Sequence, residues 1–362
     1  MDEAIPVPSR GELIDVTIEK VIFGGDGLAR LSQGFVIFVP FAAEGDRVRV
    51  KITEKKAHHA RGEIVTMLQP GPARETPPCP YYGSCGGCQY QHLTYAEECR
   101  LKENQVREAF ARVGKLPEAP VLPILAGKPY GYRNRITVHA EAGKVGFRGV
   151  KGRELIDVRE CLLARPDVNA QLDRLRAGRP ADGHYSLRDA TVPPSGFFQA
   201  NHELREPLRE LVAKALPEKG GALLEGYCGG GFFTEIVARR FERVIAVDND
   251  SRTLRDAHRL QLGNVEWRES DVAAILPFEI LEHAGKDTAV LLDPPREGLP
   301  TRVTEALCYD PVAHLVYVSC DPATLARDSR MLSKTYELVS VQPIDLFPRT
   351  AQIECVSVWR RK

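Results

Sequence analysis

The 362-residue sequence lacks the features that would place a protein in a membrane or direct it to secretion. Its first residues, MDEAIPVPSR, have neither the basic start nor the apolar run of a signal peptide. It also has no run of about 18 or more apolar residues, the length that spans a bilayer. We therefore expect a cytoplasmic protein with no membrane partner. With 43% hydrophobic residues, a chain of this length can form two or three domains.

An excess of positive charge is also missing. The sequence has 49 Lys and Arg against 49 Asp and Glu, so a globally basic nucleic-acid-binding surface is excluded and any such surface must be local. Residues 47–61 hold six basic residues and one acidic residue, residues 79–188 hold 18 and 12, and residues 189–362 hold 21 and 26. This distribution favours partner binding in the first half and small-molecule chemistry in the second.

The nine cysteines cannot all pair, and without a secretory signal they argue against a disulfide framework and for metal or catalytic use. Cys79, Cys85 and Cys88 lie in CPYYGSCGGCQYQH, and Cys161 is the best candidate for a fourth ligand. Four thiolates suit structural zinc or a [4Fe–4S] cluster. Three clustered cysteines and a distant one favour the iron–sulfur cluster. The alternative, free thiols on a glycine loop, would be prone to oxidation.

Residues 10–68 contain short β-rich runs separated by glycine turns, a pattern that predicts a small barrel. Barrels of this kind often bind single-stranded nucleic acid in a basic, aromatic groove. The residues that could form such a groove are Phe23, Phe35, Phe38, Lys51, Lys55, Lys56 and Arg61. The phenylalanines could equally be core residues.

The rest of the chain predicts two further units. A proline-rich linker is followed by a segment, TYAEECRLKENQVREAFARVG, with the apolar spacing of an amphipathic helix that ends at Gly114. Residues 131–160 predict an antiparallel meander. From about residue 190, helical segments alternate with apolar strands, which predicts a parallel, doubly wound sheet. The expected units are residues 1–70, 71–190 and 191–362.

The segment LLEGYCGGGFFTEIVARRFERVIAVDND predicts a nucleotide-cofactor site. A strand runs into a glycine turn, and a second strand ends in Asp248, 19 residues after Gly229. Glycines allow close backbone approach to a cofactor, and an acid at this place accepts hydrogen bonds from ribose hydroxyls. A dinucleotide fingerprint would have a third glycine where Thr234 stands. NAD is therefore disfavoured, and an adenosyl cofactor without a pyrophosphate is favoured.

Two further acids extend the predicted site. Asp271, in WRESDV, is placed to reach an adenine amine, and Asp293, in LLDPPREG, ends the next strand. Asp-Pro-Pro at this place is typical of methyltransferases that act on planar nitrogens or rings. Those that act on amino groups prefer an aromatic residue where Arg296 stands, so the sequence favours a ring-carbon target.

Cys320 and Glu354 are the predicted catalytic pair. Cys320 follows the apolar strand HLVYV, which should place it at the carboxyl edge of the sheet, where open α/β folds bind ligands. Methylation at carbon 5 of a pyrimidine needs a thiolate that adds to carbon 6 and a separate base that removes the carbon-5 proton. Glu354 starts the predicted final strand and is the candidate base. Its alternative interpretation is a surface glutamate on an edge strand.

Together these motifs resemble the RNA uracil-5 methyltransferase family with an N-terminal TRAM-type barrel, in the family's order and over nearly the whole chain. The resemblance implies an α/β fold: a Rossmann-like S-adenosylmethionine methyltransferase domain, an OB-like RNA-binding barrel and a small, mostly β iron–sulfur domain. It also implies that the cysteine pattern is the family's [4Fe–4S] site. The implied partner is RNA, either ribosomal or transfer RNA, and we expect the protein to act as a monomer.

The resemblance implies roles for individual residues. GFFQAN resembles the segment where Gln199 contacts the cofactor and Phe197 the target base, and YCGGGFF resembles the glycine loop. SCDPATLARD and DLFPRTAQIE resemble the motifs of the nucleophile, Cys320, and the base, Glu354. The implied cofactor-binding residues are Gln199, Tyr227, Gly229, Gly231, Asp248, Asp271 and Asp293.

Four positions depart from the family's pattern. Asp248 stands where a longer Glu is usual, Glu225 where Asp is common, and Phe232 where a polar residue often follows the glycines. Gln352 replaces a His two residues before the base, which leaves the tuning of Glu354 open.

Two other functions remain open on the sequence. An RNA cytosine-5 methyltransferase would use the same covalent chemistry, but no second well-placed cysteine for product release is evident. An iron–sulfur RNA-binding protein with a vestigial methyltransferase domain is the other alternative, and the intact Cys320, Glu354, Gln199 and Asp293 argue against it.

Overall fold

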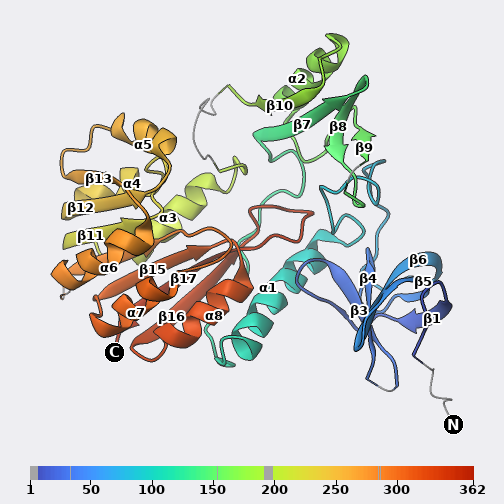
Figure 1. The fold of residues 1–362 in the computed structure, drawn as a ribbon, viewed down its shortest axis with the longest axis horizontal. Coiled ribbons are helices and arrows are strands. Elements are labelled where there is room, and N and C mark those ends of the chain that lie inside the picture. The colour runs from blue at the N-terminus through green and yellow to red at the C-terminus, as the bar shows by residue number, and fades with distance from the viewer. Residues whose placement is uncertain (1–6, 33, 153, 191–198, 284, 286) are drawn as a thin grey trace.

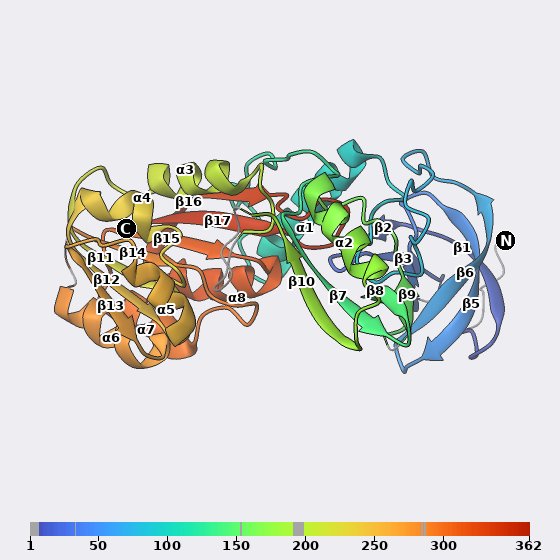
Figure 2. The ribbon, with the colours of Figure 1, turned by 90° about the horizontal axis from the view of Figure 1, so that it is seen from above.

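The computed structural model describes residues 7–32, 34–152, 154–190, 199–283, 285 and 287–362. Three β-sheets follow one another along the chain, and Figures 1 and 2 show them as three separate bodies. The N-terminal sheet and the large C-terminal sheet lie at opposite ends of the molecule.

The first sheet has six strands in the order β1-β5-β6-β4-β3-β2. It curls around a core because alternate residues point inward: along β5, Val48, Val50 and Ile52 are buried while Arg47, Arg49 and Lys51 are exposed. The predicted short strands are therefore present. Their bounds are β1 (Leu13–Thr17), β2 (Lys20–Val21), β3 (Asp26–Arg30), β4 (Val36–Pro40), β5 (Arg47–Lys55) and β6 (His59–Gln69).

The second sheet is the predicted antiparallel meander with one added strand, in the order β10-β7-β8-β9. Helix α2 (Pro166–Ala177) covers it, with Val168 and Leu172 packed in one cluster with Ile136 and Val138. The strands are β7 (Arg135–Glu141), β8 (Lys144–Arg148), β9 (Leu155–Asp157) and β10 (Gly183–Arg188).

The third sheet has seven strands in the order β13-β12-β11-β14-β15-β17-β16. Five are parallel, as predicted, and β17 runs antiparallel to both of its neighbours. The final strand is therefore an interior strand. The strands are β11 (Gly220–Gly226), β12 (Phe241–Asp248), β13 (Val265–Glu269), β14 (Thr288–Leu292), β15 (His314–Ser319), β16 (Tyr336–Ile344) and β17 (Glu354–Arg361).

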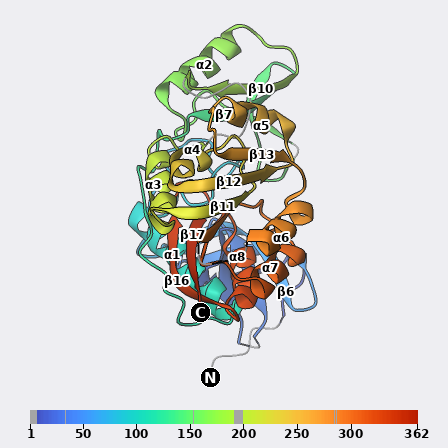
Figure 3. The ribbon, with the colours of Figure 1, turned by 90° about the vertical axis from the view of Figure 1, so that its left-hand side faces the viewer.

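Helices cover both faces of the third sheet, and Figure 3 shows α3 on the opposite side of the strands from α6 and α7. One face packs against α3 (Arg205–Ala215), α4 (Thr234–Val237) and α5 (Ser251–His258), and the 3-10 turn η1 (Ala238–Arg240) follows α4. The other face packs against α1 (Tyr95–Arg112), α6 (Val272–His283), α7 (Thr301–Tyr309) and α8 (Pro322–Leu332). Within the described ranges, none of these helices combines the length and the apolar character needed to cross a membrane.

Helix α1, predicted from its amphipathic pattern, joins the two ends of the molecule. Its Val106 and Phe110 lie in the core of the third sheet, where α1 packs against α8 and β16. Its Leu101 packs with Val21 and Ala43 of the first unit. The predicted boundaries assign this helix to residues 71–190, yet its main packing partner is the third sheet. Figure 1 shows it between that sheet and the N-terminal sheet.

Candidate active site and four-cysteine site

The glycine loop after β11 has a left-handed backbone at three positions. Tyr227, Gly229 and Gly231 have φ angles of 64°, 53° and 81°. A Cβ atom on Gly231 would lie 2.7 Å from Leu260 Cδ1 and 2.9 Å from a ring carbon of Trp267, so only glycine fits there. Tyr227 adopts the same left-handed backbone conformation although it has a side chain. Backbone strain of this kind is typical of functional loops. The helix that follows, α4, has only four residues.

Asp248 fixes this loop from the end of β12. Its Oδ2 accepts a hydrogen bond from the Gly229 amide at 2.8 Å, and its Oδ1 accepts one from the Asp250 amide at 2.9 Å. Asp271 lies at the start of α6, where it accepts from Ala273 N at 2.9 Å and is exposed. Burial raises the pKa of Tyr227 to about 12, and the charges of Asp271 and Asp248 add to the shift. The structure thus brings the predicted Tyr227, Gly229, Asp248 and Asp271 together.

Glu225 is buried beneath the loop. Thr234 Oγ1 donates a hydrogen bond to its Oε2 at 2.6 Å. Burial raises the pKa of Glu225 to about 8, and the neighbouring carboxyls of Asp293 and Asp248 raise it further. Glu225 stands where the family usually has Asp. Its carboxyl lies inside the sheet and therefore stays protonated at neutral pH.

Glu225 makes the folding stability depend on pH. Below the ordinary glutamate pKa of 4.5, the carboxyl is protonated in both the folded and the unfolded chain. Between pH 4.5 and about 8 it ionises only in the unfolded chain, so the free energy of unfolding falls as the pH rises. We expect Glu225→Gln to remove this loss and to stabilise the cofactor-free protein at pH 8, relative to pH 5, by on the order of a few kcal/mol. Urea unfolding at both pH values measures this, with the exposed Glu242→Gln as the control. Equal pH dependence in wild type and Glu225→Gln would contradict it.

Cys320 and Glu354 are neighbours across two strands. The β15–β17 ladder ends with Ser319 opposite Cys355, and Cys320 and Glu354 are the next residues of the two chain segments at this end, close enough for the Glu354 charge to act on the Cys320 thiol. Facing positions of antiparallel strands have Cβ atoms about 4.5–5.5 Å apart. Burial raises the pKa of the Cys320 thiol to about 11; the Glu354 and Asp293 carboxyls add to the shift, and Arg296 opposes it.

Glu354 is a buried carboxyl without a hydrogen-bond partner among the described residues. It is 5% exposed, and burial, followed by the charge of Asp293, raises its pKa well above the usual range. The interpretation as a surface glutamate on an edge strand is therefore wrong, because β17 is an interior strand. Burial also raises the pKa of Asp293, to about 7. Buried, unpartnered carboxyls are costly to a fold, and their clustering with a thiol marks a functional site.

Gln199 lies near the start of the third unit along the chain, and it is 5% exposed. Its backbone oxygen accepts a hydrogen bond from Asn134 Nδ2 at 2.9 Å, while its buried side-chain oxygen has no partner in the described parts of the chain. No described contact joins it to Cys320 or Glu354. Phe197, the predicted contact to the target base, lies outside the described residues.

Sequence reasoning missed Asp328, which holds the Asp-Pro-Pro loop in place. Its Oδ2 accepts hydrogen bonds from Leu299 N and from the Tyr317 hydroxyl, both at 2.9 Å. Asp328 is 5% exposed on α8. Its signal in the sequence is an acid three residues after the buried Leu325, at a position where an amphipathic helix would place an apolar residue.

The four predicted ligand cysteines line one cavity of about 70 Å³. Cys79, Cys85, Cys88 and Cys161 all line it, together with Arg133 and apolar residues. Burial raises the pKa of Cys88 to about 12, and a hydrogen bond from Gln91 Nε2 at 3.1 Å opposes the shift. The thiols are partly buried, unlike free thiols on an exposed loop.

The width of this site tests which metal group it suits. Four ligand sulfurs at about 2.3 Å from one zinc ion would lie about 3.8 Å apart. Among the described residues, no three of the cysteine sulfurs lie within 4.8 Å of one another. The cysteine sulfurs are therefore spaced more widely than a single tetrahedral ion requires.

The predicted groove residues of the first unit divide into two groups. Phe35 is 7% exposed and belongs to the core, and the Phe38 ring packs edge-on against His59 at 5.5 Å. The exposed residues are Phe23, Lys51, Lys55, Lys56 and Arg61. Arg61 also lines a cleft of about 410 Å³ with Phe41 and Arg148, where the first unit faces the second.

The doubly wound sheet, with a glycine loop and acids at its carboxyl edge, defines the class of protein: a Rossmann-like methyltransferase fold. Comparison with known families agrees. The family model described as "TRAM domain" matches residues 9–65, and that described as "tRNA (Uracil-5-)-methyltransferase" matches residues 281–362. The resemblance predicted from the sequence is thereby confirmed: both models match, in the family's order, at the two ends of the chain.

Relatives match the chain over almost its full length. An "Uncharacterized RNA methyltransferase" of Aquifex aeolicus is 28% identical, covering 95% of this chain and 98% of the relative. One of Bdellovibrio bacteriovorus is also 28% identical, covering 98% and 96%. The crystal structure of Pyrococcus abyssi tRNA (uracil-54, C5)-methyltransferase in complex with S-adenosyl-L-homocysteine has the same fold, with a TM-score of 0.74 and 22% identity over 95% of this chain and 99% of that one.

Proposed function

We propose that the protein transfers a methyl group from S-adenosylmethionine to carbon 5 of a specific uridine in RNA, with Cys320 as the nucleophile and Glu354 as the base. The observation that carries this proposal is the strand register that makes Cys320 and Glu354 neighbours. A nucleophile and a base that act on adjacent ring carbons must lie side by side, and Cys320, directly after β15, and Glu354, the first residue of β17, are a thiol and a carboxyl at the same end of this ladder.

In the proposed mechanism the Cys320 thiolate adds to carbon 6, and the electrons of the 5,6 double bond move toward the oxygen on carbon 4. Carbon 5 becomes nucleophilic and takes the methyl group, for which bound S-adenosylmethionine supplies the electrophile. The Glu354 carboxylate then removes the carbon-5 proton. The electron pair re-forms the 5,6 double bond and expels the thiolate. Burial strengthens Glu354 as a base, because its pKa lies well above the usual range.

The cofactor would lie at the carboxyl edge of the third sheet. Asp248 would accept hydrogen bonds from the ribose hydroxyls and Asp271 one from the adenine amine, while Gly229 and Gly231 allow close backbone approach. Tyr227, Asp293 and Gln199 complete the proposed set. The free side-chain oxygen of Gln199 is an acceptor that a bound ligand would satisfy.

The four cysteines would hold a [4Fe–4S] cluster with a structural role, since no step of the proposed reaction needs an electron. We expect protein purified without oxygen to contain about four iron and four sulfide per chain, as the cluster's formula requires. Cys88→Ser should lose most of this iron, whereas Cys308→Ser, on α7, should keep it. One zinc per chain, with no sulfide, would contradict the proposed cluster.

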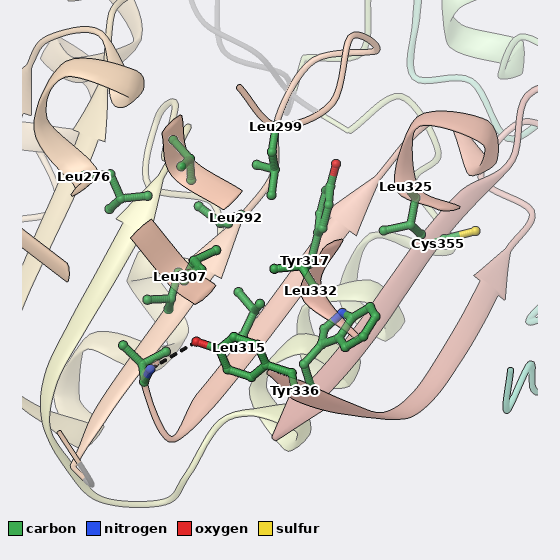
Figure 4. Packing of buried hydrophobic residues seen from close by; sticks show 14 of the residues in the cluster. Leu276, Leu292, Leu299, Leu307, Leu315, Tyr317, Leu325, Leu332, Tyr336 and Cys355 are labelled. Atoms are coloured by element: carbon green, nitrogen blue, oxygen red, sulfur yellow. Dashed lines mark hydrogen bonds between the residues drawn. The ribbon is translucent and has the colours of Figure 1, made fainter. Parts of the chain in front are cut away.

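The RNA would contact the first two units, where the exposed basic residues and the cleft beside Arg61 lie. Every residue proposed for the reaction comes from one chain, so a monomer suffices, and we propose that it acts in the cytoplasm. Uridine is favoured over cytosine as the target. The cysteine nearest to Cys320 along the facing strand is Cys355, which is fully buried and packs near Leu325 in the hydrophobic core (Figure 4).

Trapping with fluorinated RNA tests the mechanism. Fluorine on carbon 5 cannot leave as a cation, so RNA containing 5-fluorouridine should form a denaturant-stable adduct with the enzyme when S-adenosylmethionine is present. Mass spectrometry of nucleosides from natural RNA should show 5-methyluridine and not 5-methylcytidine. Absence of an adduct on folded, cofactor-loaded enzyme would contradict the mechanism. Mapping of lost 5-methyluridine in a strain without the gene would identify the RNA.

A further inference from the structure

The segment that leads into the proposed base contacts the loop that carries three of the cysteines. Residues 345–351 belong to the connection between β16 and β17, and they end three residues before Glu354. Their backbone bonds mainly to residues far away in the sequence. Tyr132 donates a hydrogen bond from its hydroxyl to Pro348 O at 2.9 Å, and Asn201 donates one from Nδ2 to Leu346 O at 3.1 Å.

Arg349 is the centre of these contacts. It is 4% exposed, and its φ angle of 67° is one that a residue with a side chain rarely adopts. Its amide donates to Glu98 Oε1 at 2.7 Å, and its Nη1 donates to Leu93 O at 2.7 Å. The guanidinium lies over the rings of Tyr95 and Tyr130, 5.4 and 4.9 Å from their centroids. Arg349 is therefore held by residues 93–130, more than 200 positions away in the sequence.

The cysteine loop is bonded to the same place. Gln89 directly follows Cys88, and the amides of Gln89 and Tyr90 both donate to Arg349 O, at 2.9 and 3.1 Å. The side-chain oxygen of Gln89 accepts a hydrogen bond from Ala351 N at 3.1 Å. The chain that leaves the four-cysteine site is therefore fixed to two backbone positions just ahead of Glu354.

A fully buried ion network anchors the start of the segment. Lys102 Nζ lies 2.8 Å from Glu98 Oε1 and 2.7 Å from Asp345 Oδ1, and the Tyr95 hydroxyl donates to Asp345 Oδ2 at 2.9 Å. Because Lys102 and Glu98 both belong to α1, the segment is clamped between α1 and the cysteine loop. Buried charges of this kind are strongly destabilising to break, so the clamp resists small displacements.

We propose that Arg349 is a positioning residue for the base, and that the four-cysteine site acts through Gln89 and Arg349 to hold Glu354 beside Cys320. The inference rests on the proposed function of Glu354. It gives the cysteine site a role in methyl transfer that involves no electron: the site keeps residues 349–351, and with them the first residue of β17, at a fixed position.

The test uses RNA with natural uridine, where the wild type releases its product. A defect confined to the base leaves addition and methyl transfer intact but stops proton removal, so the covalent enzyme–RNA adduct should accumulate. We expect Arg349→Ala to accumulate this denaturant-stable adduct while turnover falls by about 100-fold, since displacement of about 1 Å at a catalytic group has that cost. Gln89→Ala, which removes the side-chain bonds to Ala351 N and Gly86 O but keeps the backbone bonds to Arg349, should do the same to a smaller extent.

Controls separate this role from a purely structural one. Arg243→Ala removes an exposed pair with Glu266 at the opposite edge of the third sheet and should neither slow turnover nor trap adduct. Glu354→Gln supplies the reference level of adduct. If Glu354→Gln accumulates adduct but both Arg349→Ala and Gln89→Ala lose turnover without it, the positioning role is wrong. If Glu354→Gln itself shows none, the proposed mechanism fails instead.

A second readout does not depend on activity. In Cys88→Ser, amide hydrogen exchange of residues 349–354 should become at least about 10-fold faster than in the wild type, because local opening of this segment would no longer be opposed by the cysteine loop. Exchange in α5, on the other face of the sheet, should stay unchanged. Unchanged exchange at residues 349–354 after loss of the cysteine site would overturn the coupling.

Discussion

Cys320→Ala is expected to abolish methyl transfer, with turnover reduced at least about 10⁴-fold, and to form no adduct with 5-fluorouridine RNA. Without a thiolate, carbon 5 of uracil is not nucleophilic enough to attack a sulfonium, and the other groups in the site cannot replace covalent activation. Cofactor binding should survive, because Cys320 lies beside Glu354 and not in the glycine loop. Single-turnover methylation and a denaturing gel measure the two effects, and calorimetry with S-adenosylmethionine checks that the site is otherwise intact.

The control for this experiment is the neighbouring thiol. Cys355 follows Glu354 directly but is fully buried in the core with Leu325 and Trp359. Cys355→Ala should therefore keep adduct formation and turnover, with a loss of stability on the order of 1 kcal/mol from the small cavity. An adduct on Cys320→Ala that disappears in the Cys320→Ala/Cys355→Ala double variant would show that the nucleophile has been assigned to the wrong strand.

Local patterns were enough to predict where the two proposed catalytic residues lie, Cys320 directly after a strand and Glu354 at the start of one. Apolar runs end at Ser319 and begin again at Glu354, and the structure has β15 and β17 with these bounds. That Cys320 and Glu354 lie side by side could not be predicted, because the 33 intervening residues, including α8 and β16, carry no information about register. The interior position of β17 could not be predicted from the sequence either, since strand order depends on long-range pairing.

Arg349 and Lys102, which the sequence did not single out, make their contacts across long separations in the chain. Arg349 bonds to Glu98 over 251 positions, and Lys102 bonds to Asp345 over 243. In the sequence, Lys102 and Glu98 appear as part of the charged outer face of an amphipathic helix, whereas the structure buries both completely. A charge pattern shows which residues share a helix face, but only the tertiary fold shows whether water or another segment covers that face.

Glu354→Gln is expected to reduce turnover by about 10²–10⁴-fold, the range that a general base contributes, and to leave the methylated RNA attached to Cys320. The amide has nearly the same shape as the carboxylate but cannot accept the carbon-5 proton. The adduct should therefore form on natural uridine, where the wild type shows almost none. The exposed Glu337→Gln on β16 is the matched control and should behave as the wild type does.

The pH dependence identifies the base independently. A base works only when ionised, and burial together with Asp293 raises the pKa of Glu354 well above its usual range. Single-turnover release of product by the wild type should therefore rise with pH through values above the ordinary pKa of glutamate and then level off. Asp293→Asn removes the neighbouring charge, so the rise should move to lower pH. If Asp293→Asn instead stops release and traps the adduct while Glu354→Gln turns over normally, Asp293 is the base. The two carboxyls would then have exchanged roles, and the covalent step would be unchanged.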